Sequence, residues 1–210
     1  MSSALFLKIH PQNPPLNRML QVVEILRQGG LVIYPTDTIY GLGCDLHNAR
    51  AIEKLCQIKG IKPDKAHLSF VCSDLTHISD YARGISTQTY KVMKKALPGP
   101  FTFILEASSK VPKFGGAKKK TVGIRVPDNN ICLSLVRELG NPIISTSIHD
   151  EDEIIEYSTD PELIFEKYRH LVDVVIDGGF GNNVASTVVD CQNESFGILR
   201  QGAGDIEQYL

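Results

Sequence analysis

The sequence predicts an α/β fold built on a single twisted, mixed, open sheet with flanking helices. Short apolar runs alternate along the chain with segments whose apolar residues recur at helical spacing. The chain has 210 residues, of which 42% are hydrophobic and 22% are charged, so it is long enough and apolar enough to bury a sizeable core. The sequence shows neither an internal repeat nor a long linker, and we therefore expect residues 1–210 to form a single domain.

The first half of the chain is expected to contain three strands and four helices. The segment from Leu16 to Gln28 places apolar residues at helical spacing and stops at Gly29-Gly30, which is a signal for the end of a helix. The run Leu31-Val32-Ile33-Tyr34 is apolar and ends at Pro35, as a buried strand would. The expected strands are residues 5–9, 31–34 and 68–72, and the expected helices are residues 16–28, 49–58, 76–81 and 87–96.

The second half follows the break at Pro98-Gly99-Pro100 and is expected to be richer in strands. Residues 131–139 show the helical pattern. The expected strands are residues 101–105, 121–126, 142–145, 172–176, 186–189 and 197–199. Strands and helices in this mixed order favour an α/β sheet over a helical bundle or an all-β sandwich.

Composition excludes several classes of protein. No apolar run approaches the length of a membrane span, and the first residues lack the basic leader and apolar core of a secretory signal. A net charge of −2 excludes a wholly basic nucleic-acid coat. The five cysteines are odd in number and widely spaced, which argues against a disulfide scaffold or a structural zinc site and predicts reduced, mostly buried thiols in a cytoplasmic protein.

Charge is distributed unevenly along the chain. Residues 110–125 hold six basic residues and no acid, Lys59, Lys62 and Lys65 form a second basic cluster, and residues 150–162 hold seven acids and no base. Each run alone suits a solvated loop, and the basic runs also suit a face that binds phosphates. Known phosphate motifs do not account for them, because Gly115-Gly116-Ala117-Lys118 lacks P-loop spacing and the glycines of residues 178–181 lead toward a strand.

The most informative stretch is Pro35-Thr36-Asp37-Thr38-Ile39-Tyr40-Gly41-Leu42-Gly43. It follows a buried strand, and ligands of open α/β sheets bind where strands end. Its small hydroxyls and glycines would let a ligand approach backbone N–H groups closely. An ordinary turn is the alternative for this stretch taken alone. We expect it to be a binding loop because five other stretches also place a hydroxyl or an arginine at a strand edge. These are residues 98–102, 123–127, 145–147, 185–190 and 198–202.

With these six stretches in order, the whole chain resembles the YrdC/YciO family, whose best-known members are threonylcarbamoyl-AMP synthases. The resemblance implies a twisted sheet with a concave, positively charged cavity. It also implies condensation of L-threonine, bicarbonate and ATP, with Mg²⁺ on the phosphates, into threonylcarbamoyl-AMP and pyrophosphate. A partner enzyme would then modify tRNA, and some members are described as binding double-stranded RNA.

The resemblance also implies which residues contact the substrates, although it assigns no catalytic residue. Threonine would be held by Thr36, Thr102, Arg125, Ser186 and Thr187. The nucleotide would be held by Lys59, Lys62, Ser145, Ser147, His149 and Arg200. A structural salt bridge remains an alternative for Arg125, and a satisfied core hydroxyl remains one for Thr102.

Two departures place the chain nearer to the YciO branch. Ile61 stands where the family carries an arginine, and His149 stands where it carries an asparagine. A lost hydrogen bond to a charged group costs about 1.5–3 kcal/mol, so we expect a synthase of reduced activity. The alternatives are a paralogue that binds nucleotide or double-stranded RNA without synthesis, and an enzyme that hydrolyses a carbamoyl-adenylate.

Overall fold

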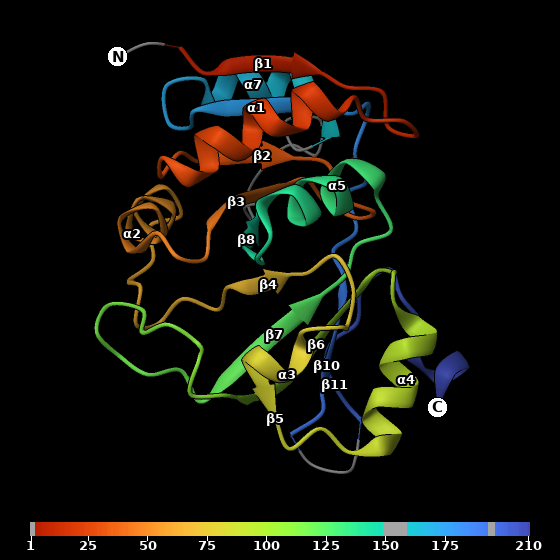
Figure 1. Ribbon diagram of the computed structural model, residues 1–210. Coiled ribbons are helices and arrows are strands. Elements are labelled where there is room, and N and C mark those ends of the chain that lie inside the picture. Colours follow the sequence, from red (N-terminus) through yellow and green to blue (C-terminus); the bar gives the residue numbers. More distant parts are fainter. Residues whose placement is uncertain (1–2, 149–158, 193–195) are drawn as a thin grey trace.

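The computed structural model describes residues 3–148, 159–192 and 196–210, and within them an eleven-stranded mixed sheet runs through the molecule (Figure 1). The order across the sheet is β1-β9-β2-β3-β8-β4-β7-β6-β10-β11, with β5 paired to β6. The ends β1 and β11 do not meet, so the sheet is open and the predicted fold class is confirmed. The strands are β1 (Leu5–Lys8), β2 (Val32–Tyr34), β3 (Gly41–Asp45), β4 (Ser69–Val71), β5 (Ala82–Arg83), β6 (Phe101–Ala107), β7 (Thr121–Arg125), β8 (Ile143–Ser147), β9 (Val174–Asp177), β10 (Thr187–Asp190) and β11 (Gly197–Arg200).

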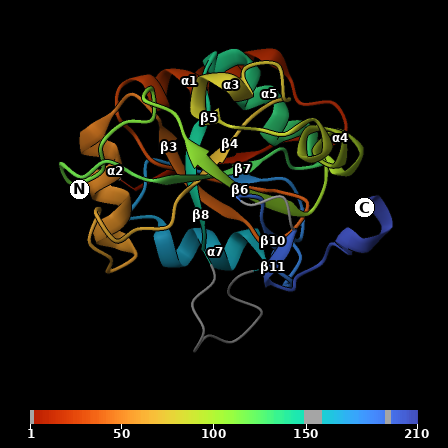
Figure 2. The same cartoon turned by 90° about the horizontal axis from the view of Figure 1, so that it is seen from below.

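Helices cover both faces of one half of the sheet. The helices are α1 (Leu16–Arg27), α2 (Ala49–Ile58), α3 (Ile78–Tyr81), α4 (Thr87–Ala96), α5 (Asn130–Leu139), α7 (Pro161–Tyr168) and the short 3₁₀ helix η1 (Ile206–Tyr209). Helices α1 and α5 pack together over β1, β9 and β2, while α7 lies on the opposite side of the sheet (Figure 2). The strands β4, β7, β6, β10 and β11 form the other half, below these helices in Figure 1.

Local sequence signals explain where the main helices begin and end. The side chains of Asn48, Ser86 and Asn129 accept hydrogen bonds from backbone N–H groups in the first turns of α2, α4 and α5. Helix α5 ends at Gly140, whose φ of 82° is the left-handed conformation that glycine adopts without strain. The predicted helices at residues 49–58 and 87–96 are confirmed to the residue.

Four elements of the structure were not predicted from the sequence, namely β3, β5, α7 and η1. Leu42 and Gly43, predicted to belong to a loop, lie inside strand β3. A Cβ at Gly41 or Gly43 would lie 3.0 Å from the ring of Tyr34 on β2, and a Cβ at Gly43 would also lie 2.5 Å from Cγ2 of Ile143, so the glycines leave room for this close packing. Helix α7 was also not predicted, although Asp160 caps it and Pro161 occupies its first turn.

The cysteines were predicted to be mostly buried, and the structure confirms their burial. All five cysteines are buried and free of disulfides. Burial raises the pKa of each thiol, to about 12 for Cys72 and Cys191, so they are poor nucleophiles. Among the described residues, the helices are too short or too polar to cross a membrane.

Candidate functional site

A cavity of about 270 Å³ opens on the sheet where β3, β8, β4, β7, β6, β10 and β11 lie side by side. The strand register aligns Gly43, Ser145, Ser69 and Gly123 in one row across β3, β8, β4 and β7. Three residues of this row, Ser145, Ser69 and Gly123, line the cavity, and their small size leaves space above the sheet. The hydroxyl-bearing residues that line the cavity are Thr38, Ser69, Thr102, Thr121, Ser145, Thr146, Ser147 and Ser186.

Gly123 keeps the middle of the cavity open. A Cβ at this position would lie 3.2 Å from Cγ2 of Thr102, 3.3 Å from Cδ1 of Ile104 and 3.6 Å from Oγ of Ser69. These contacts show that Gly123, Thr102 and Ser69 face the same side of the sheet. A side chain at residue 123 would contact the methyl group of Thr102 and the hydroxyl of Ser69 on the cavity wall.

Arg125, at the end of β7, lines the cavity and is held by the loop that follows β2. Its Nη2 atom donates hydrogen bonds to Oδ1 of Asp37 and Oγ1 of Thr38, both at 3.0 Å. Among the described residues, Nε of Arg125 and Oδ2 of Asp37 are buried without a hydrogen-bond partner. Buried polar groups are seldom left unpaired, so the pair retains hydrogen-bonding capacity for water or a ligand.

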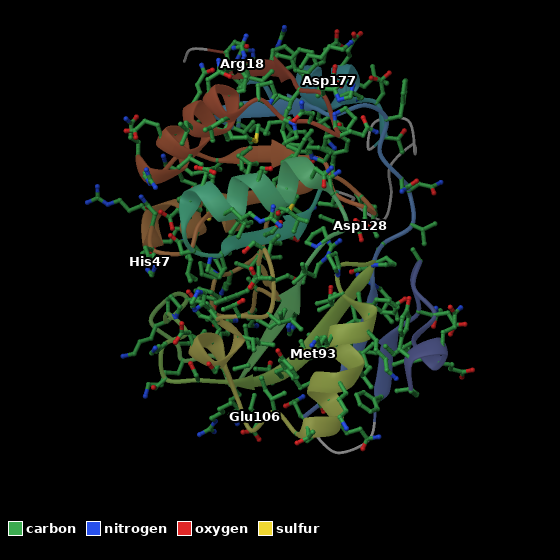
Figure 3. The ribbon with its side chains drawn as sticks, turned by 45° about the vertical axis from the view of Figure 1, so that its right-hand side comes forward. Arg18, His47, Met93, Glu106, Asp128 and Asp177 are labelled. Atoms are coloured by element: carbon green, nitrogen blue, oxygen red, sulfur yellow. The ribbon has the colours of Figure 1, made fainter. Side chains whose placement is uncertain are left out.

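Burial and neighbouring groups shift the pKa of Asp37 in opposite directions. Burial raises the pKa of Asp37 and outweighs the opposing effect of the Arg125 guanidinium. The backbone N–H of Asp128, which is labelled in Figure 3, lowers the pKa of Asp37, and the negative charge of the Asp128 carboxylate raises it to a smaller extent. The salt bridge that sequence analysis kept as an alternative for Arg125 therefore exists, and Arg125 lines the cavity as well.

Arg200 on β11 is the second arginine that lines the cavity. Its Nε and Nη2 atoms donate to the backbone oxygen of Ser186 at 3.2 and 2.8 Å, which fixes the guanidinium plane. Burial lowers the pKa of Arg200, and the positive charge of Arg125 lowers it as well. Two guanidinium groups close enough to repel each other would be stabilised by an anion between them.

The predicted hydroxyls Thr102, Ser186, Ser145 and Ser147 all line the cavity. The side-chain oxygens of Thr102 and Ser186 lie 2.9 Å apart, and the pair joins β6 to the segment that precedes β10. Ser145 accepts a hydrogen bond of 2.7 Å from the hydroxyl of Tyr34. The satisfied-hydroxyl alternative for Thr102 is thus present in the structure, together with its position on the cavity wall.

Two predicted threonine ligands do not line the cavity. Thr36 donates to the backbone oxygen of Ile39 at 2.8 Å and accepts from the backbone N–H of Thr38 at 3.0 Å, so it braces the loop that presents Thr38. Thr187 is fully buried; it donates to the oxygen of Gly204 at 2.6 Å and accepts from the N–H groups of Gly202 and Gly204. Its hydroxyl therefore holds the C-terminal segment and does not line the cavity.

The predicted lysines lie beyond the cavity wall. Lys59 caps the end of α2, Lys62 is exposed in the following loop, and neither lines the cavity. Ile61, between them, is 38% exposed and does not line it either. His149 falls outside the described residues.

Several residues of the wall were not predicted from the sequence, namely Thr38, His67, Ser69, Thr121 and Lys119. Thr38 belongs to the predicted loop and Lys119 to the predicted basic run, but neither was singled out. Thr121 begins β7, and Lys119 lies two residues before it. Side chains two residues apart share a face of a strand, so this spacing was the signal that could have placed both residues beside Arg125. Within the described ranges, no three metal-ligating side chains come together.

Comparisons with known proteins agree with this fold. Residues 24–202 match the model of the Sua5/YciO/YrdC family, which is described as "Telomere recombination". The crystal structure of Escherichia coli YciO superposes with a TM-score of 0.88 at 36% identity, covering 99% of this chain and 100% of that one. A threonylcarbamoyl-AMP synthase of Vibrio vulnificus is 31% identical over 190 residues, 89% of this chain and 100% of that protein. The structure of P. abyssi Sua5 complexed with L-threonine has a TM-score of 0.84 at 26% identity, covering 95% of this chain and 58% of that one.

Proposed function

This chain belongs to the Sua5/YciO/YrdC family, and on that basis we propose that it acts as an ATP-dependent threonylcarbamoyl-AMP synthase of reduced activity. In the proposed reaction the amine of L-threonine combines with bicarbonate to give a carbamate and water. A carbamate oxygen then attacks the α-phosphorus of ATP, and pyrophosphate leaves. Such a reaction needs the protein mainly to position the reactants and to neutralise charge on the phosphates.

The observation that carries the proposal is the pair of arginines, Arg125 and Arg200, on a cavity otherwise rich in hydroxyls. A carboxylate and a phosphate are both anions that a guanidinium binds through two N–H groups. L-Threonine supplies the first anion and ATP supplies the second. The relative that was solved with L-threonine supports an amino acid as one occupant of the cavity.

We assign the residues by their place on the wall. Arg125, Thr102 and Ser186 would hold threonine, with Thr36 acting through the loop it braces. Arg200, Ser145 and Ser147 would hold the nucleotide. Lys59, Lys62 and His149 remain predicted nucleotide contacts. A magnesium ion would be held by the ATP phosphates, since the described residues offer no cluster of ligands for it.

Reduced activity is proposed because Ile61 and His149 stand where the family carries an arginine and an asparagine, so two polar contacts to the nucleotide are lost. Lys59 and Lys62 also lie off the cavity wall. The same observation favours a second candidate, in which the cavity binds a carbamoyl-adenylate and directs its hydrolysis. An adenylate carries one phosphate, and Arg200 alone could pair with it.

The RNA-binding alternative rests on two loops that meet near the cavity. Lys119 connects them by donating to the backbone oxygens of Asp64 and Ala66. The exposed lysines of these loops are Lys62, Lys65, Lys113, Lys118 and Lys120. Affinity for double-stranded RNA that falls steeply with salt would support this alternative, and a cytoplasmic place beside tRNA-modifying enzymes would suit either role.

The deciding experiment measures pyrophosphate release from ATP with and without L-threonine and bicarbonate, together with mass detection of the adenylate. The synthase proposal expects release that needs both co-substrates and that is lost in Arg200→Ala. Release that does not need threonine, or none at high protein concentration, would contradict it. Hydrolysis of added threonylcarbamoyl-AMP in the absence of synthesis would instead support the second candidate.

A further inference from the structure

Lys119 occupies an unusual position among the lysines of the basic run. It lines the cavity, whereas its neighbours Lys118 and Lys120 are exposed and do not. Its Nζ atom donates to the backbone oxygen of Asp64 at 2.7 Å and to that of Ala66 at 2.9 Å. The same atom lies 5.8 Å from the ring centre of Phe114. The ammonium group is therefore held in one place on the wall.

Two loops that contact each other keep Lys119 in this position, the turn at residues 62–66 and the loop at residues 114–117. The turn at residues 62–66 is closed by backbone hydrogen bonds from Lys65 to Lys62 and from Ala66 to Pro63. The opposing loop folds back through paired backbone hydrogen bonds between Phe114 and Ala117. Gly115 lies against the turn, where a Cβ would come within 3.1 Å of the backbone nitrogen of Asp64 and where its φ of +57° suits glycine.

An ammonium group has three N–H donors, and two of those of Lys119 are bound to carbonyl oxygens. The third has no acceptor among the described residues. A fixed cation with one unused donor on a cavity wall is suited to a negatively charged oxygen. Arg125 forms an ion pair with Asp37. In the described part of the chain, Lys119 and Arg200 are therefore the cavity-lining lysine and arginine without a carboxylate partner.

We propose that Lys119 binds the outer phosphates of the nucleotide and supplies, from the opposite loop, the positive charge that this chain lacks at Ile61. The proposal rests on the proposed function, because it takes a nucleoside triphosphate as an occupant of the cavity. It makes Lys119 a binding residue for the β- and γ-phosphates, while Arg200 faces the phosphate next to the nucleoside. Pyrophosphate, as the leaving group, would be held by the same ammonium.

Calorimetric titration of the full chain with ATP, inorganic pyrophosphate and AMP, at one fixed Mg²⁺ concentration, tests this assignment. Lys119→Met retains the alkyl chain over Phe114 and removes the charge, and Lys120→Met is the matched control from the same loop. We expect Lys119→Met to weaken ATP and pyrophosphate binding by about 10- to 100-fold and AMP binding by less than about twofold. The affinity of Lys119→Met for pyrophosphate should fall less steeply with salt concentration than that of the native protein. Lys120→Met should match the native protein in every one of these affinities.

A purely structural role for Lys119 would give a different pattern. If the variant only loosened the wall, ATP, pyrophosphate and AMP would all weaken by the same factor, and the proposal would be overturned. Lys119→Arg, which keeps the charge, should retain the preference for ATP over AMP. If the native protein binds ATP and Lys119→Met binds it equally well, the assignment fails while the proposed function stands. If the native protein binds neither ATP nor pyrophosphate, the synthase proposal itself fails.

Discussion

Arg125 and Asp37 form an ion pair at the edge of the cavity, with Nη2 of the arginine 3.0 Å from Oδ1 of the carboxylate. The two side chains are only 12% and 10% exposed. Solvent screens such a pair weakly, so each charge depends on the other for compensation. The pair also fixes Arg125 relative to the loop that carries Thr38, which makes Asp37 a positioning residue for the cavity.

The first prediction concerns the pH dependence of stability. Burial raises the pKa of Asp37 above the unfolded value of about 3.9, so the native state favours its protonated form. Its contribution to stability is therefore greatest below the unfolded pKa and falls as pH rises through the native pKa. We expect the free energy of unfolding of the native protein, relative to Asp37→Asn, to decrease from about pH 4 upward until the native pKa has been passed. Urea unfolding at a series of pH values measures this difference, and a difference that stays constant with pH would contradict the prediction.

The second prediction separates Thr187 from the binding site. Thr187→Val removes an acceptor from the N–H groups of Gly202 and Gly204, and an unsatisfied buried group costs about 1–3 kcal/mol. We expect the free energy of unfolding to fall by about that amount while affinity for threonine, measured by calorimetry on folded protein, stays the same. Ser186→Ala, on the cavity wall, should instead weaken threonine binding and leave the free energy of unfolding unchanged. A specific loss of threonine binding in Thr187→Val, with stability unchanged, would restore the sequence-based assignment.

The third prediction concerns the space above Gly123. In Gly123→Ala the new methyl group would lie 3.2 Å from Thr102 and 3.3 Å from Ile104, so these side chains must shift by a few tenths of an ångström. We expect threonine affinity to fall about tenfold, equivalent to about 1.4 kcal/mol. Gly197→Ala is the control, because its Cβ would make an ordinary contact of 3.7 Å with Asp190 away from the cavity. Equal affinities in the two variants would show that the ligand does not occupy this part of the cavity.

The fourth prediction concerns the thiols. Burial raises the pKa of every cysteine, so the reactive thiolate is scarce at neutral pH in the folded protein. We expect a thiol-specific disulfide reagent at pH 8 to label none of the five cysteines rapidly in the native state and all five in urea. Rapid labelling of one cysteine under native conditions would reveal a local opening or a reactive site.

Sequence patterns predicted the fold class well because periodicity reports which face of an element is buried. Helices α2 and α4 have polar caps and strong amphipathic patterns, and both were predicted with their observed bounds. Strand β3 was missed because Gly41 and Gly43 have low strand propensity, and their fit against Tyr34 exists only in three dimensions. Helix α7 was missed because the surrounding acidic residues suggested a solvated loop.

The lining of the cavity was predicted in part for a similar reason. Arg125, Arg200, Thr102, Ser145, Ser147 and Ser186 line the cavity as expected. Thr187 is next to Ser186 in the sequence and Thr36 is two residues from Thr38. Which hydroxyl of each pair lines the cavity depends on strand orientation and on the partners that each one finds. Lys119 reaches the cavity by docking on the backbone of Asp64 and Ala66, residues more than fifty positions away, a contact that no local pattern encodes.

The strand order has a consequence for how the chain folds during synthesis. Strand β9 separates β1 from β2, and β10 pairs with the far side of β6, so segments from the last third of the chain complete edges formed by the first half. Until residue 190 has left the ribosome, the edges of β1, β2 and β6 that later pair with β9 and β10 have unpaired backbone N–H and C=O groups. Pairing between distant segments slows folding and leaves strand edges open to wrong partners. The nascent chain should therefore depend on chaperones more than a chain whose neighbouring strands follow each other in sequence.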